Sequence, residues 1–153
     1  MLIVFYEGFA MEVAIISPHG PGRLDLYDAE RNQYYEVKHE PQHEVFLSSN
    51  QKRKYDTSQI VGRMFTGYTF NESPTPGTRT DIAGKFEYGY WDITYQSHGD
   101  GVITYSCDLN LHRYKQHLNT LATATTGAAL GMAVGLGGGN KLCQRAKDLF
   151  LYE

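Results

Sequence analysis

Two segments of alternating polar and apolar residues, separated by a turn, place the strongest constraint on the fold of this 153-residue chain. Residues 23–28 are Arg-Leu-Asp-Leu-Tyr-Asp, and residues 34–39 are Tyr-Tyr-Glu-Val-Lys-His. Because side chains on a β-strand point to alternate faces, this pattern is typical of strands. The intervening residues 29–32, Ala-Glu-Arg-Asn, favour a turn. We therefore predict an antiparallel hairpin in which Asp28 pairs with Gln33.

The register of this hairpin determines which side chains meet. It places three pairs opposite one another: Leu26 with Tyr35, Asp25 with Glu36, and Arg23 with Lys38. Opposite residues have Cβ atoms about 5 Å apart, so two carboxylates would lie side by side, which destabilises a sheet unless something neutralises them. A hard divalent cation would do so, because Mg²⁺ is often held by one or two carboxylates together with water and phosphate.

Lys38 and the backbone of Val37 complete the predicted site. Glu36 and Lys38 share a face of the strand, and the carbonyl of Val37 lies between them as a further oxygen ligand. Lys38 would orient or deprotonate a metal-bound water and stabilise the charge of the transition state. The metal would lower the pKa of that water and polarise the phosphoryl oxygen. The pattern thus indicates hydrolysis of a phosphodiester.

Asp25 followed by Glu36-Val37-Lys38 resembles the PD-(D/E)xK nuclease signature, with Leu24 where the signature often has Pro. The resemblance implies that Asp25 and Glu36 bind Mg²⁺ or Mn²⁺ and that Lys38 is catalytic. It also implies a restriction-endonuclease-like fold. The core of that fold begins with a helix that often supplies another acidic ligand. Only about ten residues precede the first predicted strand, so this helix is truncated, missing or supplied by other sequence. Glu7 and Glu12 are the nearby acidic residues, and Glu12 is our candidate additional ligand.

Residues 51–55, Gln-Lys-Arg-Lys-Tyr, are similar to the Q-x-x-x-Y motif of the RecB-like branch of the same superfamily. There the motif lies on the helix after the catalytic strand. By this resemblance Gln51 and Tyr55 orient the substrate. Lys52 and Lys54 belong to a basic run, and we take them as candidates for contact with phosphate. Ser48-Ser49-Asn50 offers a helix N-cap, and we expect the helix to include residues 51–55 and to extend up to Arg63.

Over roughly residues 12–107 the chain looks closest to the C-terminal nuclease domains of bacterial polymorphic toxins. Those domains carry an R-[IL]-D-L-x-[DN] segment followed by Y-E-[VI]-K. They often continue into a strand pair like residues 90–95 and 101–105. The resemblance implies a toxin effector that is secreted or delivered into a target cell's cytoplasm. DNA would be its substrate, with RNA left open, and an immunity protein would be its partner.

The predicted fold class is α/β: a mixed central sheet with flanking helices, an extra β-hairpin at 86–107 around a turn at 98–101, and a helical C-terminal tail. We place the nuclease-like domain at 1–115 and a Gly/Ala-rich helical or flexible tail at 116–153. The apolar part of this tail contains four Thr between 120 and 126 and three Gly at 137–139. We therefore expect no stable membrane insertion.

Charge and metal-ligand spacing limit the other functions. The net charge of −3 excludes nucleic-acid binding by overall basicity, so a local patch such as residues 52–54 is required. Such a run is also typical of the solvated face of a helix. Cys107 and Cys143 could pair or stay reduced. His39 and His43 have metal-ligand spacing, but no further His or Cys at suitable spacing supports zinc.

Three alternatives stay open. A housekeeping nuclease of DNA repair or recombination would have the same site and act in the cytoplasm. A catalytically inactive nucleic-acid- or protein-binding module would keep the fold without the chemistry. The simplest interpretation is that Asp25 and Glu36 belong to an exposed hairpin face, with Arg23 and Lys38 as cross-strand ion partners.

Overall fold

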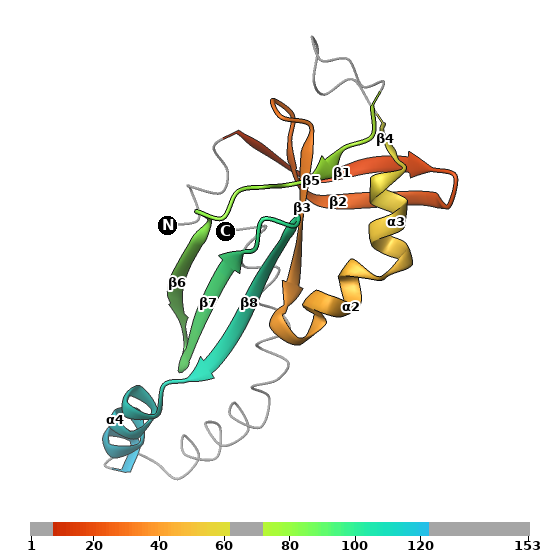
Figure 1. Ribbon diagram of the computed structural model, residues 1–153. Helices are drawn as coiled ribbons and strands as arrows, with labels where there is room; N and C mark the ends of the chain where they lie inside the picture. The colour runs from red at the N-terminus through yellow and green to blue at the C-terminus, as the bar shows by residue number, and fades with distance from the viewer. Residues whose placement is uncertain (1–7, 62–71, 123–153) are drawn as a thin grey trace.

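The computed structural model describes residues 8–61 and 72–122, which form a mixed α/β fold around a curled sheet (Figure 1). The sheet has eight strands in the order β4-β1-β2-β3-β8-β7-β6, with β5 paired to β3 off this path. The strands are β1 (Phe9–Ser17), β2 (Gly20–Asp28), β3 (Gln33–His39), β4 (Gln59–Ile60), β5 (Thr75–Pro76), β6 (Ala83–Tyr88), β7 (Trp91–Ser97) and β8 (Val102–Leu109). The helices are η1 (Glu40–Gln42), α2 (His43–Leu47), α3 (Asn50–Asp56) and α4 (Leu111–Ala122).

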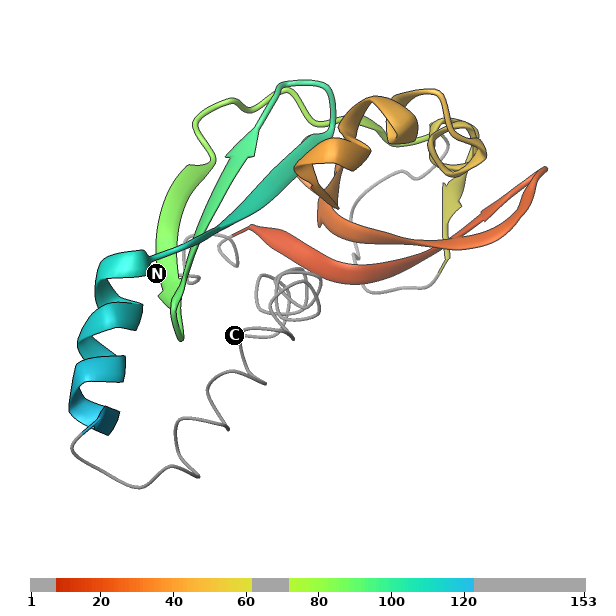
Figure 2. The same ribbon diagram turned by 90° about the horizontal axis from the view of Figure 1, so that it is seen from below.

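Strand β3 joins two antiparallel halves of the sheet. On one side β1, β2 and β3 pair in antiparallel fashion, and on the other side β8, β7 and β6 do the same. The two halves meet where β3 pairs with β8 in parallel. Figure 2 shows how strongly the sheet curls between them. The mixed sheet and its helices confirm the predicted α/β class.

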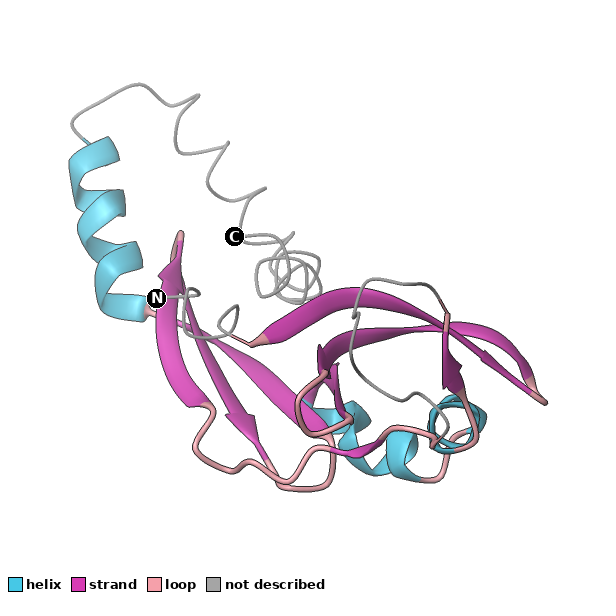
Figure 3. Ribbon diagram, turned by 90° about the horizontal axis from the view of Figure 1, so that it is seen from above, coloured by secondary structure: helices cyan, strands magenta, loops and turns pink. Residues whose placement is uncertain are grey.

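The helices divide between the two ends of the molecule. Figure 3 shows α2 and α3 beside β2 and β3, whereas α4 follows β8 at the far end of the sheet. Helix α3 begins as predicted, because Ser49 is its N-cap and the Ser49 hydroxyl accepts the N–H of Lys52 at 3.1 Å. The helix ends at Asp56, short of Arg63, and β4 follows. Arg63 itself lies outside the described residues.

The predicted hairpin at 23–39 is confirmed in its register near the turn. Asp28 pairs with Gln33 and Leu26 with Tyr35. The prediction that this ladder continues to Asp25–Glu36 and Arg23–Lys38 is wrong. Beyond residue 35, β3 pairs with residues 102–105 of β8 instead. The ladder stops there because the carboxylate of Asp25 accepts the N–H of Val37 at 2.9 Å, in the place of a main-chain carbonyl.

Asp25 lies at a kink in the β1–β2 ladder. The ladder pairs Met11 with Leu26 and Val13 with Leu24 but is interrupted between them, at Glu12 and Asp25, and Glu12 has a positive φ of 53°. Leu24 and Leu26 are two residues apart, so an ideal strand would direct both to one face. Here Leu24 belongs to one core cluster and Leu26 to the other. The strand therefore changes its packing face at Asp25, which brings this side chain to the junction of the two clusters.

An aromatic cluster holds α2 and α3 against the sheet. The rings of Tyr34 and Tyr55 meet edge to face with centroids 5.2 Å apart, and Phe46 lies 6.1 Å from Tyr55. All three side chains are buried. Burial of one large apolar side chain contributes about 1.5–3 kcal/mol, so this cluster fixes the position of α3 over β3.

Three further expectations concern the C-terminal half. The predicted turn at 98–101 joins β7 to β8, which confirms that part of the second hairpin. The predicted arm that begins at residue 86 is instead two antiparallel strands, β6 and β7, separated by a turn at 89–90. Within the described residues, no helix combines the length and apolar character needed to cross a membrane. Cys107 on β8 is disulfide-bonded. Cys143 and most of the predicted tail at 116–153 lie outside the described residues.

Candidate active site

The carboxylate of Glu36 is the centre of a polar network inside the fold. This side chain has no exposed surface. Its Oε1 lies 3.1 Å from Nζ of Lys38 and accepts an N–H from Nε2 of Gln51 at 3.1 Å. Its Oε2 lies 3.0 Å from the hydroxyl of Tyr55. A buried charge is costly unless it is paired and hydrogen-bonded, and these three contacts meet that requirement.

Gln51 links the strand to helix α3. Its Nε2 donates to Glu36 and contacts the Tyr55 hydroxyl at 2.8 Å, while its Oε1 accepts from Nζ of Lys38 at 3.1 Å. A primary amide has two N–H donors and one carbonyl acceptor, so this side chain uses all of its groups on the network. Gln51 and Tyr55 lie one turn apart on α3, as their spacing predicts. Four residues from the two predicted motifs therefore converge at one place: Glu36, Lys38, Gln51 and Tyr55.

The phenol of Tyr55 is held as a neutral hydrogen-bond donor. Its oxygen lies 2.7 Å from the carbonyl of Arg23 and 3.0 Å from Glu36. Burial raises the pKa of Tyr55, and the negative charges of Glu36 and Asp25 raise it further. The Tyr55 hydroxyl therefore keeps its proton beside the buried carboxylate of Glu36.

Asp25 and the carbonyl of Val37 lie on the edge of β3 that faces β2. The N–H of Glu36 donates to Gly101 at 2.7 Å, toward β8. Since backbone groups of successive residues point to opposite sides of a strand, those of Val37 face β2. The hydrogen bond from Val37 N–H to Asp25 agrees with this orientation. Asp25 is only 5% exposed, and its contact with the N–H of Val37 places it at this edge of β3.

The other three predicted site residues surround this network. Glu12 forms an ion pair with Arg23 at 3.2 Å, next to the kink at Asp25. Lys54 donates to the carbonyl of Pro21 at 3.0 Å. Lys52 forms an ion pair with Asp56 at 2.6 Å. Glu12 therefore remains near Asp25, Lys52 lies on the outer side of α3, and Lys54 reaches β2 on another side of the helix.

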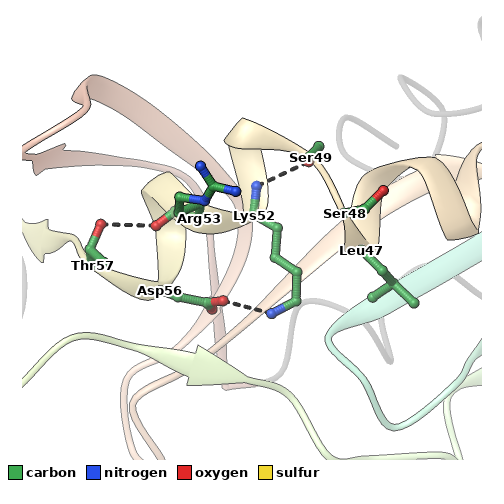
Figure 4. Close-up of a pocket in the computed structure, with 7 residues that line it drawn as sticks. All are labelled: Leu47, Ser48, Ser49, Lys52, Arg53, Asp56 and Thr57. Carbon is green, nitrogen blue, oxygen red and sulfur yellow. Dashed lines mark hydrogen bonds and ion pairs between the residues drawn. The ribbon is translucent and has the colours of Figure 1, made fainter.

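A cavity of about 220 Å³ adjoins the outer side of α3 (Figure 4). Figure 4 shows Lys52 reaching Asp56 across this space, whereas the guanidinium of Arg53 points away from Asp56. The cavity combines two basic side chains with several hydroxyl groups, a chemistry that suits phosphate oxygens. Its lining residues are Leu47, Ser48, Ser49, Lys52, Arg53, Asp56 and Thr57.

A second polar cluster was not predicted from the sequence. The spacing of His39 and His43 is that of possible metal ligands, but in the structure the two rings have different partners. His39 packs on Tyr105, with ring centroids 5.4 Å apart. His43 lies 2.7 Å from Asp100 and stacks on His98 with ring centroids 4.4 Å apart. His43 and Asp100 are 57 residues apart, so no local spacing could have revealed this pair.

The donor atoms at the main site suit a hard cation. They are oxygens of two carboxylates and one backbone carbonyl, which matches the few protein ligands that Mg²⁺ requires. In the part of the chain that the structure describes, no group of three or more His, Cys, Asp or Glu side chains is placed to hold a metal ion. Water and substrate would therefore supply the other ligands. No family model, curated protein or solved structure matches this chain.

Proposed function

We propose that this protein is a metal-dependent nuclease that hydrolyses phosphodiester bonds, with DNA as the favoured substrate. The observation that carries this proposal is the convergence of Asp25, Glu36 and Lys38 on one short stretch of β3, with Gln51 of α3 bonded to both charged partners. The curled mixed sheet with helices beside β3 supports a restriction-endonuclease-like fold.

Each residue has a distinct role in the proposed reaction. Asp25, Glu36 and the carbonyl of Val37 would hold Mg²⁺ or Mn²⁺, which when bound lowers the pKa of a water ligand and polarises the phosphoryl oxygen. Lys38, fixed by Glu36 and Gln51, would orient the attacking water and stabilise the negative charge of the transition state. Tyr55 positions Glu36 through its hydroxyl.

The outer side of α3 would contact the nucleic-acid backbone. The net charge of −3 gives the chain no general attraction to phosphate, so a local basic surface must provide it. Lys52 and Arg53 line the cavity beside α3, and Gln51 precedes them on the same helix. A strand of DNA lying along α3 would therefore place its phosphates against Lys52 and Arg53, beside Gln51. Glu12 and Lys54 flank this path on the other side.

The biological role we propose is that of a bacterial toxin effector, delivered into a target cell and neutralised by an immunity protein. This role follows from the resemblance of residues 12–107 to toxin nuclease domains. A housekeeping nuclease of repair or recombination would have the same site. Expression in a bacterial cytoplasm separates the two: a toxin arrests growth and its Lys38→Ala variant does not, whereas a housekeeping nuclease is tolerated.

One observation favours a second function, a non-catalytic binding module. Glu36 is fully buried and already has an ammonium, an amide and a phenol as partners. Such a network can act as a structural link between α3 and β3 without any chemistry. In that case added Mg²⁺ would leave the thermal stability unchanged. If the folded protein binds the ion, an ion concentration ten times the Kd raises the free energy of unfolding by about 1.4 kcal/mol.

The decisive experiment is cleavage of plasmid and linear DNA by the purified chain with Mg²⁺ and with a chelator. We expect cleavage only with Mg²⁺, and a loss of at least about 100-fold in Asp25→Ala, Lys38→Ala and Lys38→Gln. Lys85→Ala is the matched control, because Lys85 also forms an ion pair with a carboxylate, at 3.6 Å to Asp92, but lies on β6. Full activity in both Lys38 variants would overturn the proposed mechanism.

A further inference from the structure

Four residues form a second protic cluster next to the proposed nuclease site. Nε2 of His43 lies 2.7 Å from Oδ2 of Asp100, and the ring of His43 stacks on that of His98. Nε2 of His98 lies 2.7 Å from the hydroxyl of Thr104. Asp100 is itself fixed, because its Oδ1 accepts the N–H of Val102 at 3.1 Å. The cluster connects α2 with the turn between β7 and β8.

Two independent contacts place this cluster beside Lys38. Thr104, which binds His98, is the ladder partner of Lys38 in the β3–β8 pair, and such partners project from the same face of the sheet. From the other direction, Nζ of Lys38 lies 5.5 Å from the ring centroid of Phe46 on α2. His43 precedes Phe46 by three residues, so both lie on one side of that helix.

The arrangement can deliver a proton from His43. A carboxylate on one ring nitrogen orients an imidazole and stabilises its protonated form. Nε2 of His43 faces the carboxylate of Asp100, whereas Nε2 of His98 faces the hydroxyl of Thr104. In the described part of the chain, Nδ1 of His43 has no hydrogen bond. The side chain is 18% exposed, which leaves it accessible to a ligand.

We propose that His43 is the general acid of the phosphodiester hydrolysis, an inference that rests on the proposed function. Water forms the new P–O bond, and the P–O bond to the leaving nucleoside oxygen breaks. The Nδ1 proton of the His43 imidazolium passes to that oxygen, which leaves as a hydroxyl. The proton lost by the attacking water reaches solvent, and solvent returns a proton to His43. Asp100 acts as a positioning residue for His43.

The test compares oxygen and sulfur as the leaving atom. One oligodeoxynucleotide has its natural linkage at a site that the wild type cuts with Mg²⁺, and two others carry a bridging sulfur there, on the 3′ or the 5′ side. A thiolate leaves without protonation. A general acid contributes about 10²–10⁴-fold, so His43→Ala should lose at least about 100-fold on the oxygen linkage. On the substrate in which sulfur is the leaving atom, the cleavage rate of His43→Ala should fall by less than about threefold.

The ratio of the two rates within one protein sample does not depend on the fraction that is folded, so impaired folding of His43→Ala cannot mimic the result. Asp100→Asn should show the same selective loss, but a smaller one. Val45→Ala is the control on α2, because Val45 is 62% exposed, and both of its rates should match the wild type. Equal losses on oxygen and sulfur, or full activity of His43→Ala, would refute the role of His43 and leave the nuclease proposal standing. A wild-type protein that cuts none of the three oligodeoxynucleotides would refute both the role of His43 and the nuclease proposal.

Discussion

Replacing Tyr55 by Phe tests whether the phenol stabilises the buried Glu36 carboxylate. The change removes one hydroxyl and keeps the ring that packs on Tyr34 and Phe46. Three contacts are lost: those from the hydroxyl to Oε2 of Glu36 at 3.0 Å and to the carbonyl of Arg23 at 2.7 Å, and the one from Gln51 Nε2 at 2.8 Å. A hydrogen bond to a charged group contributes about 1.5–3 kcal/mol, and a buried acceptor left without a donor costs a similar amount. We expect a loss of about 2–3 kcal/mol in the free energy of unfolding.

Urea unfolding followed by circular dichroism measures this loss, with Tyr27→Phe as the matched control. Tyr27 is also buried, on β2, but its hydroxyl donates to a neutral amide, Oδ1 of Asn32, at 2.6 Å. We expect this control to lose about 1 kcal/mol. The slope of the unfolding free energy against urea concentration should be the same in the wild type, Tyr55→Phe and Tyr27→Phe. If Tyr55→Phe loses no more than Tyr27→Phe, the phenol does not stabilise the Glu36 charge, and the account of the network fails.

Two further predictions concern stability. Gly77→Ala should destabilise the fold by about 1–3 kcal/mol, because a Cβ there would lie 2.0 Å from the ring of Tyr35. Thr78→Ala, at the exposed neighbouring residue, should leave the stability unchanged. Thermal unfolding of both variants measures the difference. Burial, followed by the hydrogen bond to Asp56, raises the pKa of Tyr34, so the folded chain keeps a proton that the unfolded chain loses above about pH 10. The contribution of Tyr34 to the free energy of unfolding is complete below that pH and falls by about 1.4 kcal/mol per pH unit above it. Between pH 9 and 11 the unfolding free energy of the wild type should therefore fall more steeply than that of Tyr34→Phe, and equal slopes would contradict the assignment.

The sequence predicted those features that depend on local geometry. The alternation at 23–39 and the length of the turn were enough to pair Asp28 with Gln33, since register follows from a period of two and the turn. The four-residue spacing of Gln51 and Tyr55 was enough to place them on one side of a helix. The end of the ladder depends on a side chain replacing a main-chain acceptor, and alternation carries no information about that exchange.

Contacts between distant segments account for what the sequence did not predict. The pairing of β3 with β8 joins residues 36–39 to 102–105, and this parallel ladder brings Thr104 next to β3. Parallel pairing requires a long connection, so no turn signal marks its register. His43 therefore had no visible partner in the sequence, although its contact with Asp100 is among the shortest side-chain contacts in the described residues.

The change of partner along β3 is what opens the proposed site. Up to Tyr35 one edge of β3 is bonded to β2, and from Glu36 onward the opposite edge is bonded to β8. If β2 had continued alongside β3, its main chain would occupy the edge of Val37, and the carbonyl there would be spent on the ladder. Because β2 bends away at Asp25, its carboxylate meets the N–H of Val37 instead. The break in the predicted ladder therefore leaves the carbonyl of Val37 outside the β2–β3 ladder, where the proposed cation site would use it.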